Sequence, residues 1–154
     1  MGPLRVRVTV GSLGVVAVSH APLVPVAGPW RVGLAVERLA SGDPWLRVKT
    51  TERRLYDRVR AGLAAGMDEV VFANQRDEVC EGTISSVFFD AGAGLCTPPL
   101  ACGLLPGVLR AEMLAAGRCR EAVLMVADLG RVRLWLGNSL RGLVPASMMG
   151  SGFE

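Results

Sequence analysis

The first third of the chain alternates apolar and polar residues, which is the pattern of half-buried β-strands. Val6, Val8 and Val10 alternate with arginine and threonine, and residues 11–14 read as a turn before a second apolar stretch. Little in this region has helical spacing. The strands that the pattern predicts are residues 4–10, 15–19 and 31–37, with a proline-containing stretch at residues 21–29 between the last two.

The spacing of apolar residues changes to that of a helix after residue 50. Leu55, Val59 and Leu63 are four positions apart, and Thr51 precedes them as the expected N-cap. Two glycines then weaken and end the pattern. Lys49 is therefore expected just before a helix.

The rest of the chain alternates short strands with one more helix. Residues 69–73 are a compact apolar strand, and residues 79–89 continue as the second arm of a hairpin that carries Glu81. The pattern as a whole predicts a mixed α/β or α+β domain. The remaining expected elements are a helix at residues 108–116, strands at 123–126 and 132–136, and a tight turn at 137–139.

Composition narrows the classes of protein that the chain can represent. With 154 residues, 51% of them hydrophobic, the chain can bury the core of one main domain. Its net charge of +3 is spread without a basic run, so we expect no nucleic-acid partner. No apolar run is long enough to span a bilayer, and we expect a soluble, cytoplasmic protein with no membrane partner.

Metal binding and nucleophilic hydrolysis both lack the residues they need. The four cysteines show no Cys-x-x-Cys spacing, and His20 is the only histidine, so a zinc site is not expected. The single histidine and the absence of a Gly-x-Ser-x-Gly turn also argue against a base-assisted serine or cysteine hydrolase. The thiols are expected to be reduced.

Lys49 is the only lysine in the chain. The other sixteen of its 17 basic residues are arginine. Arginine cannot form an imine and stays protonated, whereas a lysine can lose its proton and condense with an aldehyde. Glu81 is the second candidate, as a carboxylate among small polar residues after an apolar strand. The turn from Leu105 into the helix at Val108, and Ser139 after a glycine and an asparagine, are candidate phosphate-binding elements.

Six segments resemble the class IV pyridoxal-phosphate-dependent aminotransferases, and they occur in that family's order. Within the group, the Lys-Thr-Thr sequence that starts at Lys49 and the Asn-Ser-Leu-Arg-Gly sequence that starts at Asn138 are most similar to aminodeoxychorismate lyase. Branched-chain and D-amino-acid aminotransferases are the relatives. The segments are residues 49–57, 68–72, 81–88, 97–100, 102–107 and 137–142.

The resemblance implies a role for each candidate residue in binding pyridoxal 5'-phosphate. Lys49 would be the catalytic Schiff-base lysine and Glu81 would pair with the pyridine nitrogen. Leu105 would lie against the ring. The backbone amides of Val108 and Leu109, with the Ser139 hydroxyl, would hold the phosphate.

The resemblance also implies a reaction on a small amino substrate. A lyase would eliminate pyruvate from 4-amino-4-deoxychorismate to give 4-aminobenzoate for folate synthesis, whereas an aminotransferase would give a keto acid. The third alternative is a truncated, non-catalytic domain that needs a partner chain.

Family members carry a whole N-terminal domain before the lysine. In this chain we expect residues 1–48 to be a strand-rich remnant of it with a linker, and residues 49–154 to be the cofactor-binding C-terminal domain. The apolar surface left without that domain predicts a homodimer or a partner chain. Two residues differ from the usual pattern of these lyases: Val48 stands where histidine is frequent and Ser86 where asparagine is usual.

Overall fold

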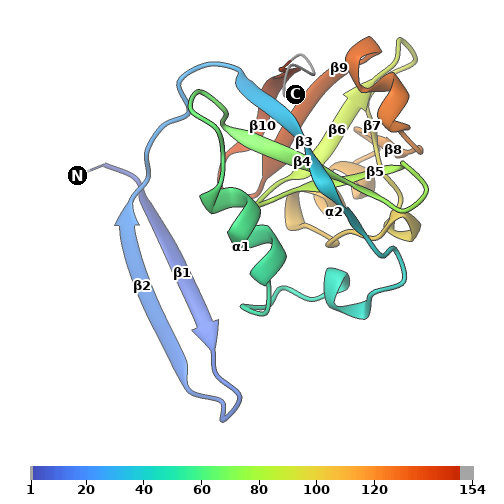
Figure 1. Cartoon of the computed structure of the whole chain (residues 1–154). Helices are drawn as coiled ribbons and strands as arrows, with labels where there is room; N and C mark the ends of the chain where they lie inside the picture. Colours follow the sequence, from blue (N-terminus) through green and yellow to red (C-terminus); the bar gives the residue numbers. More distant parts are fainter. Residues whose placement is uncertain (1, 150–154) are drawn as a thin grey trace.

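The strands form two separate sheets in a mixed α+β fold, in the computed structural model of residues 2–149 (Figure 1). Residues 150–154 of the expected domain 49–154 lie outside the described part of the chain. The strands are β1 (Leu4–Val10), β2 (Val16–Pro22), β3 (Trp30–Leu39), β4 (Glu69–Asn74), β5 (Val79–Gly82), β6 (Ser86–Asp90), β7 (Cys96–Thr97), β8 (Arg120–Glu121), β9 (Arg133–Asn138) and β10 (Gly142–Met148). The helices are α1 (Arg54–Ala61) and α2 (Val108–Ala115), with 3-10 turns η1 (Pro44–Arg47), η2 (Leu100–Cys102) and η3 (Val126–Arg131).

The larger sheet has eight strands in the order β5-β4-β3-β10-β9-β6-β7-β8, and an additional pairing between β5 and β6 closes six of them into a ring. Strand β3 lies between β4 and β10 and is parallel to both. It thus joins residues from the expected N-terminal segment 1–48 to strands of the segment 49–154. The division of the chain into two domains at residue 48 stays a prediction. It would place β3 in one domain and the strands paired with it, β4 and β10, in the other.

The smaller sheet is the antiparallel hairpin of β1 and β2, which projects from the body of the molecule (Figure 1). Its side chains alternate between two faces, as in any strand pair. One face carries apolar side chains that are mostly open to solvent. They are Leu4, Val6, Val8, Val10, Val16 and Val18, each 48–68% exposed.

The ring of strands is buried on both sides, so successive residues of one strand belong to different cores. In β4, Val71 packs into the core inside the ring, whereas Phe72 packs outside it with Tyr56 of α1. In β6, Val87 and Phe88 divide in the same way, and Phe88 packs with residues of α2. Helices α1 and α2 therefore each cover an outer surface of the sheet, and both begin near its β5–β6 connection.

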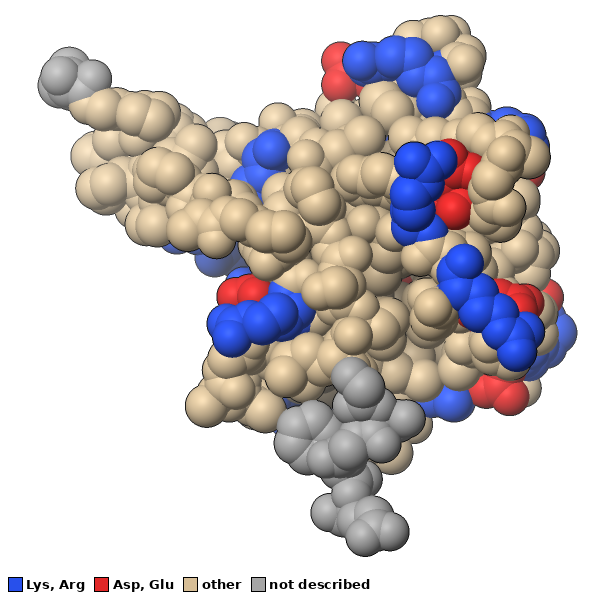
Figure 2. Space-filling model, turned by 90° about the horizontal axis from the view of Figure 1, so that it is seen from above, with Lys and Arg blue, Asp and Glu red and all other residues tan. Residues whose placement is uncertain are grey.

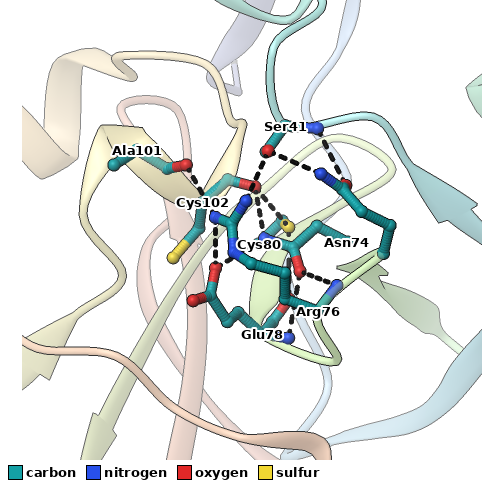
Figure 3. Close-up of polar contacts among 8 residues, drawn as sticks. Ser41, Asn74, Arg76, Glu78, Cys80, Ala101 and Cys102 are labelled. Carbon is teal, nitrogen blue, oxygen red and sulfur yellow. Dashed lines mark hydrogen bonds and ion pairs between the residues drawn. The ribbon is translucent and has the colours of Figure 1, made fainter.

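A polar network around the β4–β5 turn fixes two segments that lead into the candidate site (Figure 3). The Arg76 guanidinium donates to Glu78 Oε2 at 2.6 Å, to the Ser41 hydroxyl at 2.9 Å and to the Ala101 carbonyl at 3.2 Å. The turn thereby holds the chain around Ser41, which leads to Lys49, and the η2 turn, which leads to Leu105. The Asn74 side chain adds a 2.9 Å bond to the Cys102 carbonyl.

The same two segments touch each other directly at Gly103. This residue has a positive φ of 89°, which favours glycine. A Cβ at this position would lie 2.6 Å from the Cα of Ser41, so only glycine allows this close approach.

Three local expectations differ from the structure. Helix α1 begins at Arg54 rather than after Thr51, because Thr51 accepts a backbone bond from Arg53 in an irregular turn. The expected arm at residues 79–89 is two strands, β5 and β6, separated by a polar loop at 83–85. Residues 123–126 form no strand, since Met125 makes only an isolated bridge to Glu78 before η3 begins.

Charge is distributed in pairs over the surface. On the face seen in Figure 2, arginines lie among carboxylates and form no continuous basic patch. Arg133 with Asp90, and Arg38 with Asp77, are two such pairs elsewhere in the described chain. Between residues 2 and 149, no helix is long and apolar enough to cross a membrane.

Candidate active site

A cavity of about 350 Å³ lies where η1, the start of α1, the β5–β6 loop and the start of α2 meet. This volume is in the range of small-molecule sites, about 300–1,000 Å³. All six residues singled out from the sequence line it, although they are spread over 90 positions of the chain. They are Lys49, Glu81, Leu105, Val108, Leu109 and Ser139. The structure thus brings the six together, while their individual roles stay predictions.

Lys49 lies in the short connection between η1 and α1, at the edge of the cavity and still partly open to solvent. Partial burial lowers the pKa of its ammonium group, and the positive charge of Arg53 lowers this pKa further. The Glu81 carboxylate acts in the opposite direction and raises it. A lowered pKa increases the fraction of neutral amine, which is the form that attacks a carbonyl carbon.

Glu81 lies on β5, with only 7% of its surface exposed. Its Oε1 accepts a 2.6 Å hydrogen bond from the Tyr56 hydroxyl, and its Oε2 accepts a 3.1 Å bond from the backbone N–H of Leu105. Burial raises the pKa of the Glu81 carboxyl to about 7. The two hydrogen bonds and the charges of Lys49 and Arg53 lower this pKa and so limit the rise.

The opposite wall of the cavity is the start of α2. Among residues 2–149, no side chain caps this helix, so the backbone N–H groups of its first turn lack a side-chain acceptor, and Gly107, Val108 and Leu109 line the cavity. The positive end of a helix favours an anion at such a position. The packing around this helix start leaves no room for side chains at two glycines. A Cβ at Gly107 would lie 2.8 Å from the Ser86 Oγ, and a Cβ at Gly137 would lie 2.8 Å from a methyl of Leu109.

Ser139 follows Asn138 in the β9–β10 turn. The Asn138 Oδ1 accepts bonds of 3.1 Å from the backbone N–H groups of Leu140 and Arg141, so the side chain closes its own turn. Ser139 is exposed at this turn and lines the cavity. The strand end that leads to Ser139 lies close to the start of α2, since a Cβ at Gly137 would lie 2.8 Å from Leu109.

Sequence reasoning missed the buried carboxylate of Glu69, at the start of β4. This side chain is fully buried, and its Oε1 accepts a 2.5 Å bond from the Thr83 hydroxyl. Its Oε2 accepts bonds of 3.2 Å from the backbone N–H of Ile84 and from the Ser85 hydroxyl. Glu69 therefore fixes the loop that follows Glu81. This loop forms part of the cavity wall. An acidic residue inside an otherwise apolar strand was the available signal.

Sequence reasoning also gave no role to Arg53 and Tyr56, which line the cavity. The Arg53 side chain donates to the Thr83 carbonyl, pairs with Asp57 at 2.9 Å and lies over the Tyr56 ring at 5.3 Å from its centre. Lys49, Arg53 and Tyr56 are spaced four and three positions apart, which would place them on one side of a helix, although in the structure α1 begins only at Arg54. This spacing was the signal in the sequence.

These features fit pyridoxal phosphate, the cofactor that the family resemblance implies. The cavity combines a primary amine, a buried carboxylate that two donors hold in place, and an uncapped helix start. An aldehyde, a ring nitrogen and a phosphate need those three partners respectively. The residues present thus offer one candidate partner for each of these three parts of the cofactor.

Comparison with known proteins adds independent information. The family model for amino-transferase class IV matches residues 2–148 of the chain. No curated protein matches it. A protein from Mesorhizobium loti, provisionally named an amino-acid aminotransferase, is 46% identical over 95% of this chain and 73% of its own, with a TM-score of 0.91.

Two further solved structures are similar in fold. A protein from Legionella pneumophila, provisionally named a 4-amino-4-deoxychorismate lyase, is 22% identical over 90% of this chain and 55% of its own, with a TM-score of 0.81. A hypothetical aminotransferase from Mycobacterium tuberculosis, solved with α-ketoglutarate and PMP, is 25% identical over 96% of this chain and 60% of its own, with a TM-score of 0.75. The chain thus spans little more than half the length of these two proteins.

Proposed function

Because this chain belongs to the class IV aminotransferase family, we propose that it binds pyridoxal phosphate through Lys49 and acts on a small amino substrate. Enzymes of this family depend on pyridoxal phosphate. The observation that carries the proposal is the convergence of Lys49 and Glu81 on one cavity of about 350 Å³. They are the only lysine of the chain and a carboxylate that two hydrogen-bond donors hold in place.

We assign the cofactor contacts to the residues that line the cavity. Lys49 would hold the aldehyde carbon, Glu81 the ring nitrogen, and Leu105 one face of the ring. The amides of Val108 and Leu109 and the Ser139 hydroxyl would hold the phosphate. When bound, pyridoxal phosphate supplies an aldehyde that condenses with amines and a ring that withdraws electrons from the substrate carbon.

The protein's own part in the chemistry is to move one proton and to hold one charge. The Lys49 amine would be the base that takes a proton from the substrate carbon and returns it elsewhere. Partial burial and the charge of Arg53 lower the pKa of this amine, which favours the neutral form that accepts a proton. Glu81, when ionised, would keep a proton on the ring nitrogen, and only 7% of its surface is exposed.

Amino transfer is the first candidate reaction. The relative provisionally named an amino-acid aminotransferase is similar along 95% of this chain at 46% identity. This similarity covers far more of the chain than the Lys-Thr-Thr and Asn-Ser-Leu-Arg-Gly segments, on which the resemblance to the lyase depends. An amino donor and a 2-oxo acid acceptor would then be the substrates.

Elimination of pyruvate from 4-amino-4-deoxychorismate, in folate synthesis, is the second candidate. The Lys-Thr-Thr sequence at Lys49 and the Asn-Ser-Leu-Arg-Gly sequence at Asn138 favour this lyase. Assays of the purified chain separate the two reactions, because a lyase releases pyruvate without an amino acceptor. An aminotransferase instead needs 2-oxoglutarate or another 2-oxo acid and forms the matching amino acid.

The experiment that tests the cofactor site is covalent trapping. The purified chain is mixed with pyridoxal phosphate, reduced with borohydride and digested, and the labelled peptide is located by mass spectrometry. A label on Lys49, with none on this peptide in Lys49→Arg, supports the proposal. Since the chain has one lysine, label on the N-terminal amine alone would contradict it and favour the domain that needs a partner chain.

We also propose that a second copy or another chain covers the apolar face of the β1–β2 hairpin. Its six exposed leucine and valine side chains form a surface that single soluble domains rarely leave open. A homodimer is our first expectation. Sedimentation velocity of the purified chain tests it, and a monomer at micromolar concentration would count against it.

A further inference from the structure

Tyr56 and Glu81 lie on different elements and meet at the wall of the cavity. Tyr56 is on α1, Glu81 is on β5, and the hydroxyl donates to Glu81 Oε1 over 2.6 Å. This distance is typical of a strong hydrogen bond to an ionised acceptor. The second carboxylate oxygen is held by the Leu105 amide at 3.1 Å. Both oxygens of Glu81 therefore have a fixed donor.

The Tyr56 ring is itself held in place on two sides. Its centre lies 4.8 Å from that of the Phe72 ring, with the planes tilted by 55°, and the Arg53 guanidinium lies 5.3 Å from it. Phe72 is fully buried, so the ring rests on a rigid core. A hydroxyl on an immobilised ring loses little conformational entropy when it makes its hydrogen bond.

We infer that Tyr56 is the positioning residue of Glu81: its hydroxyl fixes the direction of the carboxylate and keeps it ionised for a cationic ring nitrogen. This inference rests on the proposed function, because only a cofactor site gives an ionised Glu81 a purpose. Tyr56 acts through Glu81, and no contact with the substrate is assigned to it.

The surroundings of Glu81 explain why such a donor is needed. Burial raises the pKa of the Glu81 carboxyl to about 7, and a protonated carboxyl cannot pair with a cation. The ionisable groups around it are Tyr56, Lys49, Arg53 and the buried thiol of Cys80. The thiol is uncharged because burial raises its own pKa, so the groups that oppose the rise at Glu81 are the Tyr56 hydroxyl, the Leu105 amide and the two cations.

The first test uses Tyr56→Phe without cofactor. Phenylalanine keeps the ring on Phe72 and removes only the hydroxyl. The titration of Glu81 is followed by infrared carboxyl absorption, assigned by difference from Glu81→Gln. We expect the midpoint to rise by about one pH unit or more, as for the loss of a hydrogen bond to a charged group. An unchanged midpoint would overturn the inference.

Thr97→Val is the matched control for the loss of a buried hydroxyl. The Thr97 hydroxyl donates a 2.8 Å bond to the Val87 carbonyl and is fully buried, but the residue does not line the cavity. We expect this variant to be less stable and to leave the Glu81 midpoint unchanged. An equal shift of the Glu81 midpoint in both variants would mean that the shift in Tyr56→Phe reflects a general loss of stability and not the loss of its hydrogen bond.

The second test is reciprocal, and it uses the fact that Tyr56 is the only tyrosine. Burial and then the Glu81 charge raise the pKa of its hydroxyl far above the ordinary value. In Glu81→Gln the charge is gone, and ultraviolet absorbance should show the phenol ionising at lower pH than in the wild type. No difference between the two proteins would contradict the coupling.

The third test connects the pair to the cofactor. Affinity for pyridoxal phosphate, measured by fluorescence titration, should fall about tenfold or more in Tyr56→Phe at pH 7 and recover in part at pH 9, where Glu81 is again ionised. A loss that is equal at both pH values would indicate a purely structural role. If the wild type takes no label on Lys49, the proposed function fails, but the two titrations still decide the role of Tyr56.

Discussion

The Asn138 side chain joins two segments that are 54 positions apart: its Nδ2 donates a 3.1 Å hydrogen bond to the backbone carbonyl of Ile84. The same side chain closes the turn that carries Ser139, through its Oδ1. One residue thus fixes the turn before β10 relative to the loop after β5. Both segments line the cavity, so the distance between the candidate phosphate end and the Glu81 end depends on this amide.

Replacing Asn138 with alanine is expected to lower the free energy of unfolding by about 2 kcal/mol, because three hydrogen bonds to the backbone are lost. Affinity for pyridoxal phosphate should fall as well. Asn138→Asp keeps the acceptor of the turn but places a carboxylate oxygen against the Ile84 carbonyl and a negative charge near the candidate phosphate end, so its affinity should fall at least as far as that of Asn138→Ala. Thermal unfolding and fluorescence titration measure the two effects, and wild-type affinity in Asn138→Ala would argue against this role.

Glu69→Ala should be strongly destabilising. The change leaves the Thr83 hydroxyl and the Ile84 amide without their buried acceptor, at a cost of about 3 kcal/mol in total. Asp128→Ala is the control, because its ion pair with Arg131 is exposed on both sides and should contribute less than about 1 kcal/mol. Urea unfolding compares the two variants. Equal effects would mean that the Glu69 network does not hold the cavity wall.

The titration of Glu81 predicts how stability depends on pH. Between pH 4.5 and about 7 the folded carboxyl keeps its proton, whereas that of the unfolded chain is ionised. The folded state therefore binds more protons, and this group makes stability fall as the pH rises through that interval, by about 3 kcal/mol in total.

Glu81→Gln removes this dependence. The difference in unfolding free energy between the variant and the wild type should grow in favour of the variant from pH 4.5 to 7 and then level off. Urea unfolding at several pH values, without cofactor, measures it. If this difference in unfolding free energy did not change with pH, the Glu81 carboxyl would have the same pKa in the folded and the unfolded chain.

Gly137→Ala tests the close approach of β9 to α2. The new Cβ would lie 2.6 Å from the Gly142 carbonyl oxygen and 2.8 Å from Leu109, so the backbone must shift at a cost of about 2 kcal/mol or more. Gly130→Ala is the matched control, since its Cβ meets nothing within 4 Å. Thermal unfolding should show a loss only for Gly137→Ala, and crystals of that variant should show α2 displaced from the strand.

Much of the local structure could be predicted from the sequence. The alternation at residues 4–10 predicted the bounds of β1, and the turn that ends at Gly107 predicted the start of α2 at Val108. The six segments that resemble the family also contain or adjoin the six candidate residues, and these residues line one cavity. Each of these conclusions depends on neighbours within a few positions, or on a motif that is written continuously in the chain.

The tertiary structure decided what depends on distant partners. Strand β10 has a proline and small residues and gives little strand signal, but it forms because β9 and β3 pair with its two edges. Glu69 begins an apolar strand in the sequence, but only the folding of the 83–85 loop over it supplies the donors to its carboxylate. Tyr56 reaches Glu81 only because α1 packs on Phe72.

The physical reason is the range of the forces involved. Periodicity records which side of an element avoids water, and the sequence carries this information locally. Hydrogen-bond partners, the burial of a carboxylate and the pKa that follows depend on which elements meet, and here the meeting residues are 14 to 54 positions apart. The sequence alone therefore determined most of the elements and the residues available for chemistry, whereas the packing of α1, α2 and the strands decided the remaining elements, the geometry of the site and the charge of its groups.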